Sequence, residues 1–226
     1  MEFAAARQTL PDRLQAVAAR AVARPLFWLA AVALLAGFPI VRALRVRLPP
    51  PPPLLGAMPA FSLVDPLGQT VRFTPGAAGA FEEISGRVWI ASFLAPKEAI
   101  ASPFLARLQE LQDRLRNLGE SFALVSFCRD ATPAELAAVG RARRASPRLW
   151  KLLAGQPPEL EAAAEAAFAK AVGGKLSDVD RESLTRGNSL LLVDGRGRIR
   201  GVYDGSDKLA VETLIGEVGL LANHVH

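Results

Sequence analysis

The chain has 226 residues, which suits one globular domain with accessory segments, and half of these residues are hydrophobic. Its mean hydropathy of +0.21 is high for a wholly soluble protein. The net charge of +5 would fit nucleic acid or an anionic membrane surface as a partner, but the basic residues are mostly scattered arginines. The one cluster, at Arg141, Arg143 and Arg144, has no interleaved aromatic residues, which favours a solvated helix face over nucleic-acid binding. A single cysteine permits no internal disulfide, so the cysteine count indicates no redox compartment.

One uncharged segment, residues 25–41 between Arg24 and Arg42, explains the high hydropathy. At about 1.5 Å per residue it is slightly shorter than a hydrocarbon core of roughly 30 Å. Flanking alanines and Leu44 extend it while the arginines reach the headgroups. We therefore predict a transmembrane anchor over residues 25–44, preceded by a basic amphipathic tail over 1–24 that lies on the membrane. A cleaved signal peptide is the alternative, but its charged region would be long and no small-x-small site follows. A buried helix of a soluble protein is favoured less.

The orientation of this anchor follows only weakly from charge, because arginines before and after the span are nearly balanced. A short inside tail with an exported domain is the simpler arrangement. It predicts a single-pass protein of the inner (cytoplasmic) membrane with its C-terminal domain on the periplasmic or extracytoplasmic side. The five prolines at 49–53 predict a stiff polyproline II spacer within residues 45–57. A ligand for a proline-recognition domain is the alternative. The globular domain is expected over residues 58–226.

The first half of that domain has clear strand and helix signals. Alternation over 61–65 and 70–73 predicts a hairpin, and residues 87–93 form an apolar strand. Ser102 with Pro103 begins a helix whose apolar positions keep helical spacing and which ends near residue 119. Residues 122–127 are expected to form a buried central strand. Thr132 and Glu135 have capping-box spacing and open another helix.

The second half predicts an alanine-rich helix over 157–172 and a hairpin of strands 189–193 and 198–203. Ser206 is expected to cap the last helix. A strand–helix–strand crossover implies parallel pairing, and the closing hairpin adds antiparallel strands. The fold class is therefore α/β, a mixed sheet flanked by helices, with a thioredoxin-like order of elements.

Several short motifs occur in a recognisable order behind the anchor. They are Pro-Ala-Phe-Ser-Leu-Val-Asp from Pro59, Gly-Arg-Val-Trp-Ile-Ala-Ser-Phe from Gly86, Leu-Trp-Lys-Leu-Leu from Leu149, and Leu-Leu-Val-Asp-Gly-Arg-Gly-Arg-Ile-Arg-Gly-Val-Tyr from Leu191. With these motifs the chain resembles the Sco/SenC family of membrane-anchored copper chaperones over roughly residues 58–222. The peroxiredoxin branch of the same superfold shares the first two motifs, while the tryptophan and Arg-Gly-Val-Tyr motifs favour the Sco-like side.

The resemblance implies a copper site, but its ligands are missing from this chain. Family members bind copper through Cys-x-x-x-Cys-Pro after the first central strand and a histidine before the last hairpin. Here the two cysteine positions fall on Glu98 and Ser102, and the histidine position falls near Arg186 or Gly187. A carboxylate, a hydroxyl and a guanidinium cannot replace the soft thiolates and imidazole of a copper(I) site. We therefore expect a degenerate member with no metal and no other cofactor.

The residues at the vacated positions have alternative roles. An ion pair between Arg186 and Glu98 could fill the old pocket. Ser102 as a nucleophile would need a base, and the histidines, His224 and His226, stand only at the C-terminus, so a helix cap is the simpler role. These two histidines could ligate metal weakly, but they fall in a tail that is expected to fray.

Cys128, at the end of the 122–127 strand, is the weak candidate for chemistry. The neighbouring Arg129 could lower the pKa of the thiol, as a redox-active cysteine requires. A buried, inert cysteine is the favoured alternative. Trp89 and Trp150 are expected in the core.

Two functions follow. The preferred one is a membrane-tethered, non-catalytic binding or assembly module, or an accessory subunit, whose partners the resemblance places in respiratory complexes of the cytochrome c oxidase type. The other is a thiol-based redox protein that uses Cys128. No small-molecule substrate is indicated.

Overall fold

The computed structural model describes residues 50–75, 86–94, 102–174 and 188–223, together with seven positions between 25 and 37. The chain divides into two compact units, Met1–Pro49 and Pro50–His226. The described positions of the first unit are helical, and four large apolar side chains among them are exposed, namely Trp28, Leu29, Val32 and Leu35. Within the described part of the chain, no helix is both long enough and apolar enough to cross a bilayer.

The second unit is built on one sheet of eight strands in the order β1-β8-β7-β4-β5-β6-β2-β3. The strands are β1 (Gly56–Ala57), β2 (Phe61–Val64), β3 (Thr70–Phe73), β4 (Val88–Leu94), β5 (Phe122–Cys128), β6 (Trp150–Ala154), β7 (Ser189–Val193) and β8 (Arg198–Asp204). The helices are α3 (Pro103–Leu115), α4 (Pro133–Ala142), α5 (Pro158–Val172) and α7 (Lys208–Asn223), with a 3-10 segment η2 (Arg116–Ser121) after α3. The helix expected to end near residue 119 thus leaves regular α geometry at Leu115.

The centre of the sheet is parallel and its flanks are antiparallel. β4 pairs in parallel with β5, and β5 with β6, while β7 runs antiparallel to both β4 and β8. Every residue of β4, β5 and β7 is buried, as expected for strands covered on both faces. The prediction of a mixed sheet flanked by helices is therefore confirmed. Strands β1 and β6 were not predicted.

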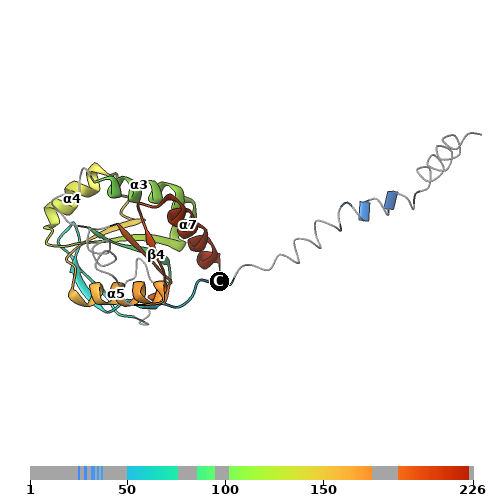
Figure 1. The fold of residues 1–226 in the computed structure, drawn as a ribbon. Coiled ribbons are helices and arrows are strands. Elements are labelled where there is room, and N and C mark those ends of the chain that lie inside the picture. The colour runs from blue at the N-terminus through green and yellow to red at the C-terminus, as the bar shows by residue number, and fades with distance from the viewer. Residues whose placement is uncertain are drawn as a thin grey trace, which may run out of the picture. The chain divides into compact units, whose positions relative to one another are not determined.

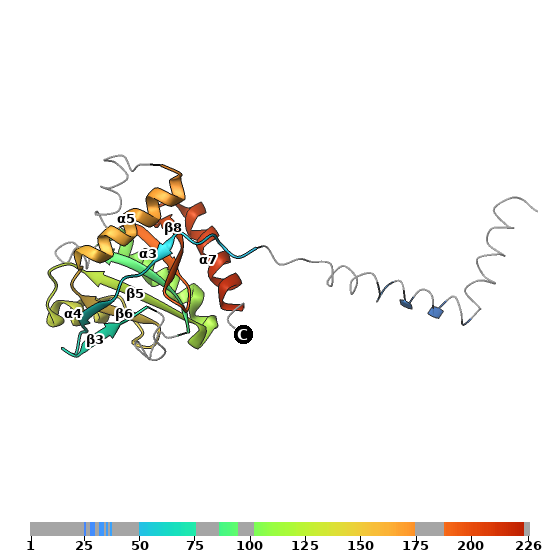
Figure 2. The same ribbon diagram turned by 90° about the horizontal axis from the view of Figure 1, so that it is seen from below.

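Helices and a hairpin cover the two faces of the sheet differently. Figure 1 shows α3, α4 and α7 on one side of the strands and α5 on the other. Side chains alternate along each strand, so the sheet has a core on each face. On β4, Val88 and Ile90 belong to the first core, which α3, α4 and α7 cover, and Trp89 and Phe93 belong to the second core, on the α5 side. Figure 2, which views the α5 side, shows that this second face is shared by α5 and the N-terminal strands.

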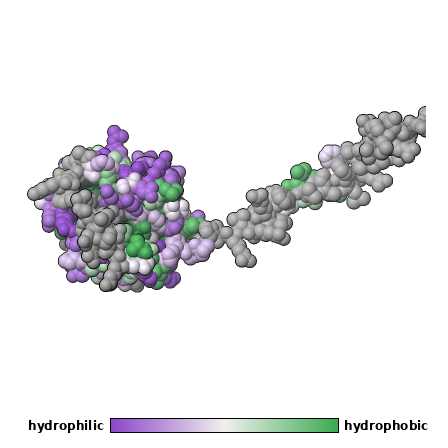
Figure 3. All heavy atoms as spheres, viewed as in Figure 1, coloured by the Kyte–Doolittle hydropathy of each residue, from purple (hydrophilic) through white to green (hydrophobic). Residues whose placement is uncertain are grey.

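An aromatic cluster fills the second core beneath the β2–β3 hairpin. The Phe61 ring lies 5.2 Å, centroid to centroid, from both Phe73 and Phe127, and Phe73 meets Trp89 edge-on. Trp89 and Trp150 are both buried, so the prediction that they belong to the core is confirmed. In the view of Figure 3 the surface of this unit is mainly hydrophilic, with hydrophobic side chains in small separate patches.

Two of the three predicted helix caps are confirmed. The amide of Phe104 donates to Ser102 Oγ, and Thr132 and Glu135 form a reciprocal capping box. The prediction for Ser206 is wrong. The Leu209 amide donates to Asp207 Oδ1 at 2.8 Å, while the Ser206 hydroxyl donates to Asp204 Oδ1.

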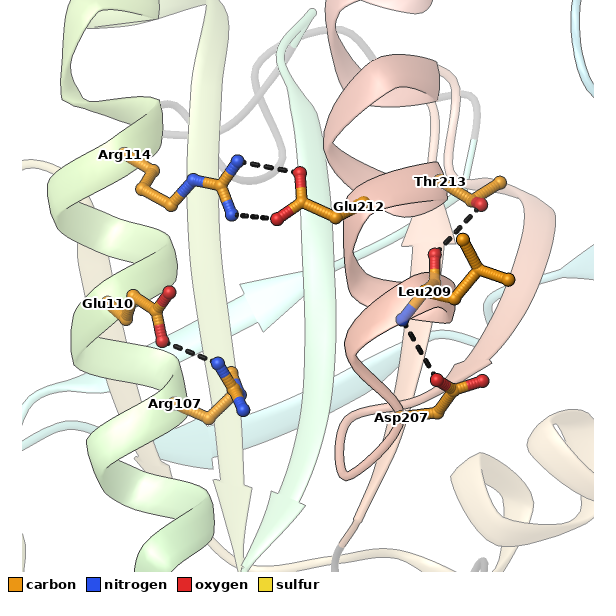
Figure 4. Close-up of polar contacts among 7 residues, drawn as sticks. All are labelled: Arg107, Glu110, Arg114, Asp207, Leu209, Glu212 and Thr213. Atoms are coloured by element: carbon orange, nitrogen blue, oxygen red, sulfur yellow. Dashed lines mark hydrogen bonds and ion pairs between the residues drawn. The ribbon is translucent and has the colours of Figure 1, made fainter.

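Figure 4 shows this Asp207 cap beside the contacts between α3 and α7. Arg114 on α3 donates through both terminal nitrogens to the carboxylate of Glu212 on α7, at 2.6 and 2.8 Å. The side-chain hydrogen bond between the two groups raises the pKa of Arg114 and lowers the pKa of Glu212. Because both side chains are solvated, this pair orients the two helices and adds little stability.

Candidate functional site

The site expected from the resemblance lies where β4 and β5 end side by side. Leu94 is the register partner of Cys128, and the Arg129 amide donates to the Leu94 carbonyl at 3.1 Å. In the sequence, Glu98 stands between the end of β4 and Ser102. Glu98, Arg186 and Gly187 lie outside the described residues, as do His224 and His226. The ion pair between Arg186 and Glu98 therefore stays a prediction.

Ser102 is the described member of the vacated ligand set, and its groups are engaged locally. Its side-chain oxygen accepts from the Phe104 amide at 3.2 Å. Its carbonyl accepts from the Ala106 amide and from the Arg143 guanidinium, each at 3.4 Å. Pro103 follows at the first helical position, where its fixed φ suits a helix start. The residue acts as the N-cap of α3.

Cys128 lies at the end of β5 with its side chain in the core that α3, α4 and α7 cover. The residue is 3% exposed, and desolvation by burial raises the pKa of its thiol to about 12. A reactive cysteine needs the opposite shift, because the thiolate is the nucleophile.

The lowering of the Cys128 pKa expected from Arg129 is not found. The Arg129 guanidinium instead forms an ion pair with Glu161 on α5, which covers the other face of the sheet. Successive side chains of an extended backbone point to opposite faces, so neighbours in sequence are separated by the sheet. Among the described residues no group of three or more His, Cys, Asp or Glu side chains is positioned to hold a metal ion.

A second candidate site, which sequence reasoning missed, lies along the open edge of β6. A cavity of about 1030 Å³ extends between α4, β6 and the tip of the β2–β3 hairpin. We call it the β6 groove. Its walls include Leu136 from α4, Val71 from β3, and Leu152 and Leu153 from β6. Figure 2 shows α4, β6 and β3 at the same end of the domain.

The β6 groove has a basic rim. Four of its lining residues are cationic, namely Arg72, Arg141, Arg144 and Lys151, and Asp65 is the acidic one. Desolvation lowers the pKa of Lys151, and the negative charge of Asp65 opposes that shift. Two of these residues, Arg141 and Arg144, belong to the cluster that the sequence interpretation assigned to a solvated helix face. The signal that could have found the groove is their juxtaposition with a strand edge, and a linear sequence does not contain it.

Comparisons with known proteins agree on the fold. No protein-family model and no curated protein matches this sequence. Among solved structures, BsSco, a member of the Sco family of cytochrome c oxidase assembly proteins, is 20% identical with a TM-score of 0.54, covering 77% of this chain and 98% of its own. A SCO1/SenC family lipoprotein from Bacillus anthracis str. Ames is 21% identical with a TM-score of 0.53, covering 75% and 97%. The soluble domain of Sco1 from Bacillus subtilis is 22% identical with a TM-score of 0.50, covering 78% and 97%. The fold of this chain is therefore the thioredoxin-like fold of Sco/SenC proteins.

Proposed function

We propose that this chain is a degenerate Sco/SenC-type protein, a membrane-tethered binding module that assists the assembly of a respiratory membrane complex without metal or thiol chemistry. The observation that carries the proposal is the lack of an accessible thiol. The chain has a single cysteine, and that cysteine is buried behind α3 and α4 with a raised pKa. The two family thiolate positions fall on Glu98 and on Ser102, which caps a helix.

The donor set argues against copper transfer. Copper(I) is held by soft thiolate and imidazole ligands, and a carboxylate, a hydroxyl and a guanidinium offer none of these. The same burial that protects Cys128 disfavours the redox alternative, since exchange with a partner thiol requires an accessible thiolate. Function is then left to surfaces of the domain and to its attachment.

Membrane attachment is supported by the segment around residues 25–41. Its composition is uncharged, and the described large side chains on it are exposed apolar groups, as lipid-facing residues are. We propose a single-pass anchor in the inner membrane with the thioredoxin-like unit on the extracytoplasmic side. The respiratory assignment is supported by the likeness to BsSco, a member of the Sco family of cytochrome c oxidase assembly proteins. Because one fold hosts many functions, co-purification of the partners is the direct test of this assignment.

That test is purification of the full-length chain from membranes in mild detergent through an affinity tag, followed by identification of the co-purifying proteins. Subunits or assembly intermediates of a respiratory complex are the expected partners. The Cys128→Ser variant should recover the same proteins, because the thiol takes no part. Loss of these partners in Cys128→Ser, with the fold intact, would support the redox function instead.

Copper binding is tested on the same preparation by metal analysis after dialysis. The wild-type chain is expected to retain none. The matched control is a variant with all three family ligands restored, Glu98→Cys with Ser102→Cys and Arg186→His, which should gain copper. Tight one-to-one copper binding by the wild-type chain would sink the degenerate-site proposal.

A further inference from the structure

The strand β6 has an open edge around Leu152, between Trp150, whose amide donates to the Ser146 carbonyl at 2.7 Å, and Ala154, which pairs with Val64 of β2. The Leu124 amide donates to the Leu149 carbonyl, and the Gly155 amide donates to the Cys128 carbonyl. From Leu149 to Gly155, the odd-numbered residues therefore direct their backbone N–H and C=O groups toward β5. The backbone groups of the even-numbered residues between them face away from β5. Within the described strands, β2 pairs with β6 only at Val64 and Ala154. The N–H and C=O of Leu152 thus lie on the open side.

This open edge borders the β6 groove. Trp150, Leu152 and Leu153 line the cavity together with Leu136 of α4 and Val71 of β3. The β2–β3 hairpin turns away after Val64, held by a turn in which Asp65 Oδ1 accepts from the amides of Leu67 and Gln69 at 2.8 Å. The turn leaves space beside β6 where a continuing strand would lie. An extended segment entering that space would find backbone partners at its edge and apolar side chains on both walls.

The rim indicates the charge of the occupant. Arg141 and Arg144 stand on the α4 side, and Arg72 and Lys151 stand on the hairpin and β6 side, against the single carboxylate of Asp65. Arg72, Arg141 and Arg144 are exposed, and among the described residues no ion pair involves any of the three. A cleft lined by one sign of charge attracts segments of the opposite sign and rejects those of its own.

We propose that the β6 groove binds an extended acidic segment of a partner protein, which adds a strand to the open edge of β6. The inference deepens the proposed function, because it gives the chemistry of the assembly partner that the function requires. The occupant carries a few apolar side chains for the walls of the groove and aspartate or glutamate residues for its rim.

The charge balance also excludes the other obvious occupants. A second copy of this chain would bring two basic rims together at a β6–β6 contact, and like charges in close apposition disfavour pairing. The N-terminal segment of the chain itself carries arginines at positions 7, 13, 20 and 24 before its apolar stretch, so it is a poor match for a basic groove.

The experiment uses the full-length chain in detergent micelles and a library of peptides about nine residues long, which span roughly 30 Å when extended. Central positions are drawn from Val, Ile, Leu and Phe, and outer positions from Asp and Glu. A matched library has Lys at the outer positions. We expect retention of acidic peptides only, with at least tenfold weaker binding when a central amide of a retained peptide is N-methylated. Methylation removes a backbone donor without changing charge, so it separates strand pairing from simple charge attraction.

Variants and amide exchange complete the test. Arg141→Glu combined with Arg72→Glu should weaken binding at least tenfold. Arg196→Glu in the exposed β7–β8 turn should not, and circular dichroism checks that each variant folds. Bound peptide should slow hydrogen exchange at the Leu152 amide.

Three results would overturn the proposal. The first is equal retention of the two libraries, and the second is binding unaffected by N-methylation. The third is occupation of the groove by a small anionic amphiphile, probed with dodecyl phosphate, or by a second copy, probed by sedimentation. If no respiratory subunits co-purify but the acidic peptides bind as expected, the assembly role is rejected and the peptide-binding role of the β6 groove stands.

Discussion

At the scale of single residues, burial determines what the side chains can do. Asp194, in the β7–β8 turn, shows this for a carboxylate. Burial raises its pKa, but hydrogen bonds from the backbone of Arg198 and Arg196 and from the side chains of Arg200 and Arg198 outweigh that effect, and the net pKa is lowered. Arg200 also donates to the Pro52 carbonyl at 3.2 Å. Asp194 therefore holds the turn closed and positions an arginine that ties down the segment before β1.

For Cys128 the net pKa is raised instead of lowered, and this leads to a prediction about stability and pH. Its pKa is raised from 9.0 to about 12 by desolvation, so the folded state keeps the thiol proton after the unfolded state has lost it. The unfolded chain then binds fewer protons, and stability falls as pH rises through 9. Between pH 8 and pH 10 the free energy of unfolding of residues 48–226 should fall by about 1.4 kcal/mol more than in Cys128→Ala. Urea unfolding at both pH values measures the difference, and identical pH dependence in the two proteins would contradict a buried neutral thiol.

At the scale of elements, capping decides where α7 begins. Two neighbouring residues were possible caps, and the structure assigns the role to Asp207, whose carboxylate accepts from the Leu209 amide. Ser206 is turned back toward Asp204 by its own amide and hydroxyl. A carboxylate at this position also interacts favourably with the positive end of the helix dipole.

This assignment predicts unequal effects of two alanine substitutions. Asp207→Ala should destabilise the domain by about 1 kcal/mol, because it leaves an amide of the first helical turn without its partner. Ser206→Ala removes only an exposed contact and should cost a few tenths of a kcal/mol. Thermal or urea unfolding of both variants measures this. A larger loss in Ser206→Ala would restore the sequence-based expectation.

At the scale of the whole molecule, the two units differ in where their apolar side chains lie. The unit Pro50–His226 encloses two apolar cores on either side of one sheet, and few of its described large apolar residues are exposed. In the unit Met1–Pro49, the described apolar side chains lie outward. We expect the lipid bilayer to cover them.

Fractionation tests this division. The full-length chain should sediment with membranes and resist extraction with alkaline carbonate, as an integral anchor does. A chain that begins at Leu48 should appear in the soluble fraction with its fold intact. Release of the full-length chain by carbonate would show that residues 25–44 do not span the bilayer.

The sequence by itself determined most of the local structure, because local structure depends on near neighbours. Period-two alternation predicted β2 and β3, a continuous apolar run predicted β5, and side-chain caps predicted the starts of α3 and α4. The absence of the thiolate pair is likewise a sequence fact. Strand β6 was not predicted, because its sequence Trp-Lys-Leu-Leu-Ala shows neither period-two alternation nor a continuous apolar run.

Only the tertiary structure decided which residues meet. Arg129 follows Cys128 in sequence, yet the sheet sends Arg129 toward Glu161 and Cys128 into the opposite core, so burial sets the pKa of the thiol. Arg72 and Arg141 are far apart in sequence, and the fold brings both to the rim of one groove. Such features depend on strand order and on which edges remain open. Strand order and open edges are set by long-range packing, so they cannot be inferred from residues that are neighbours in sequence.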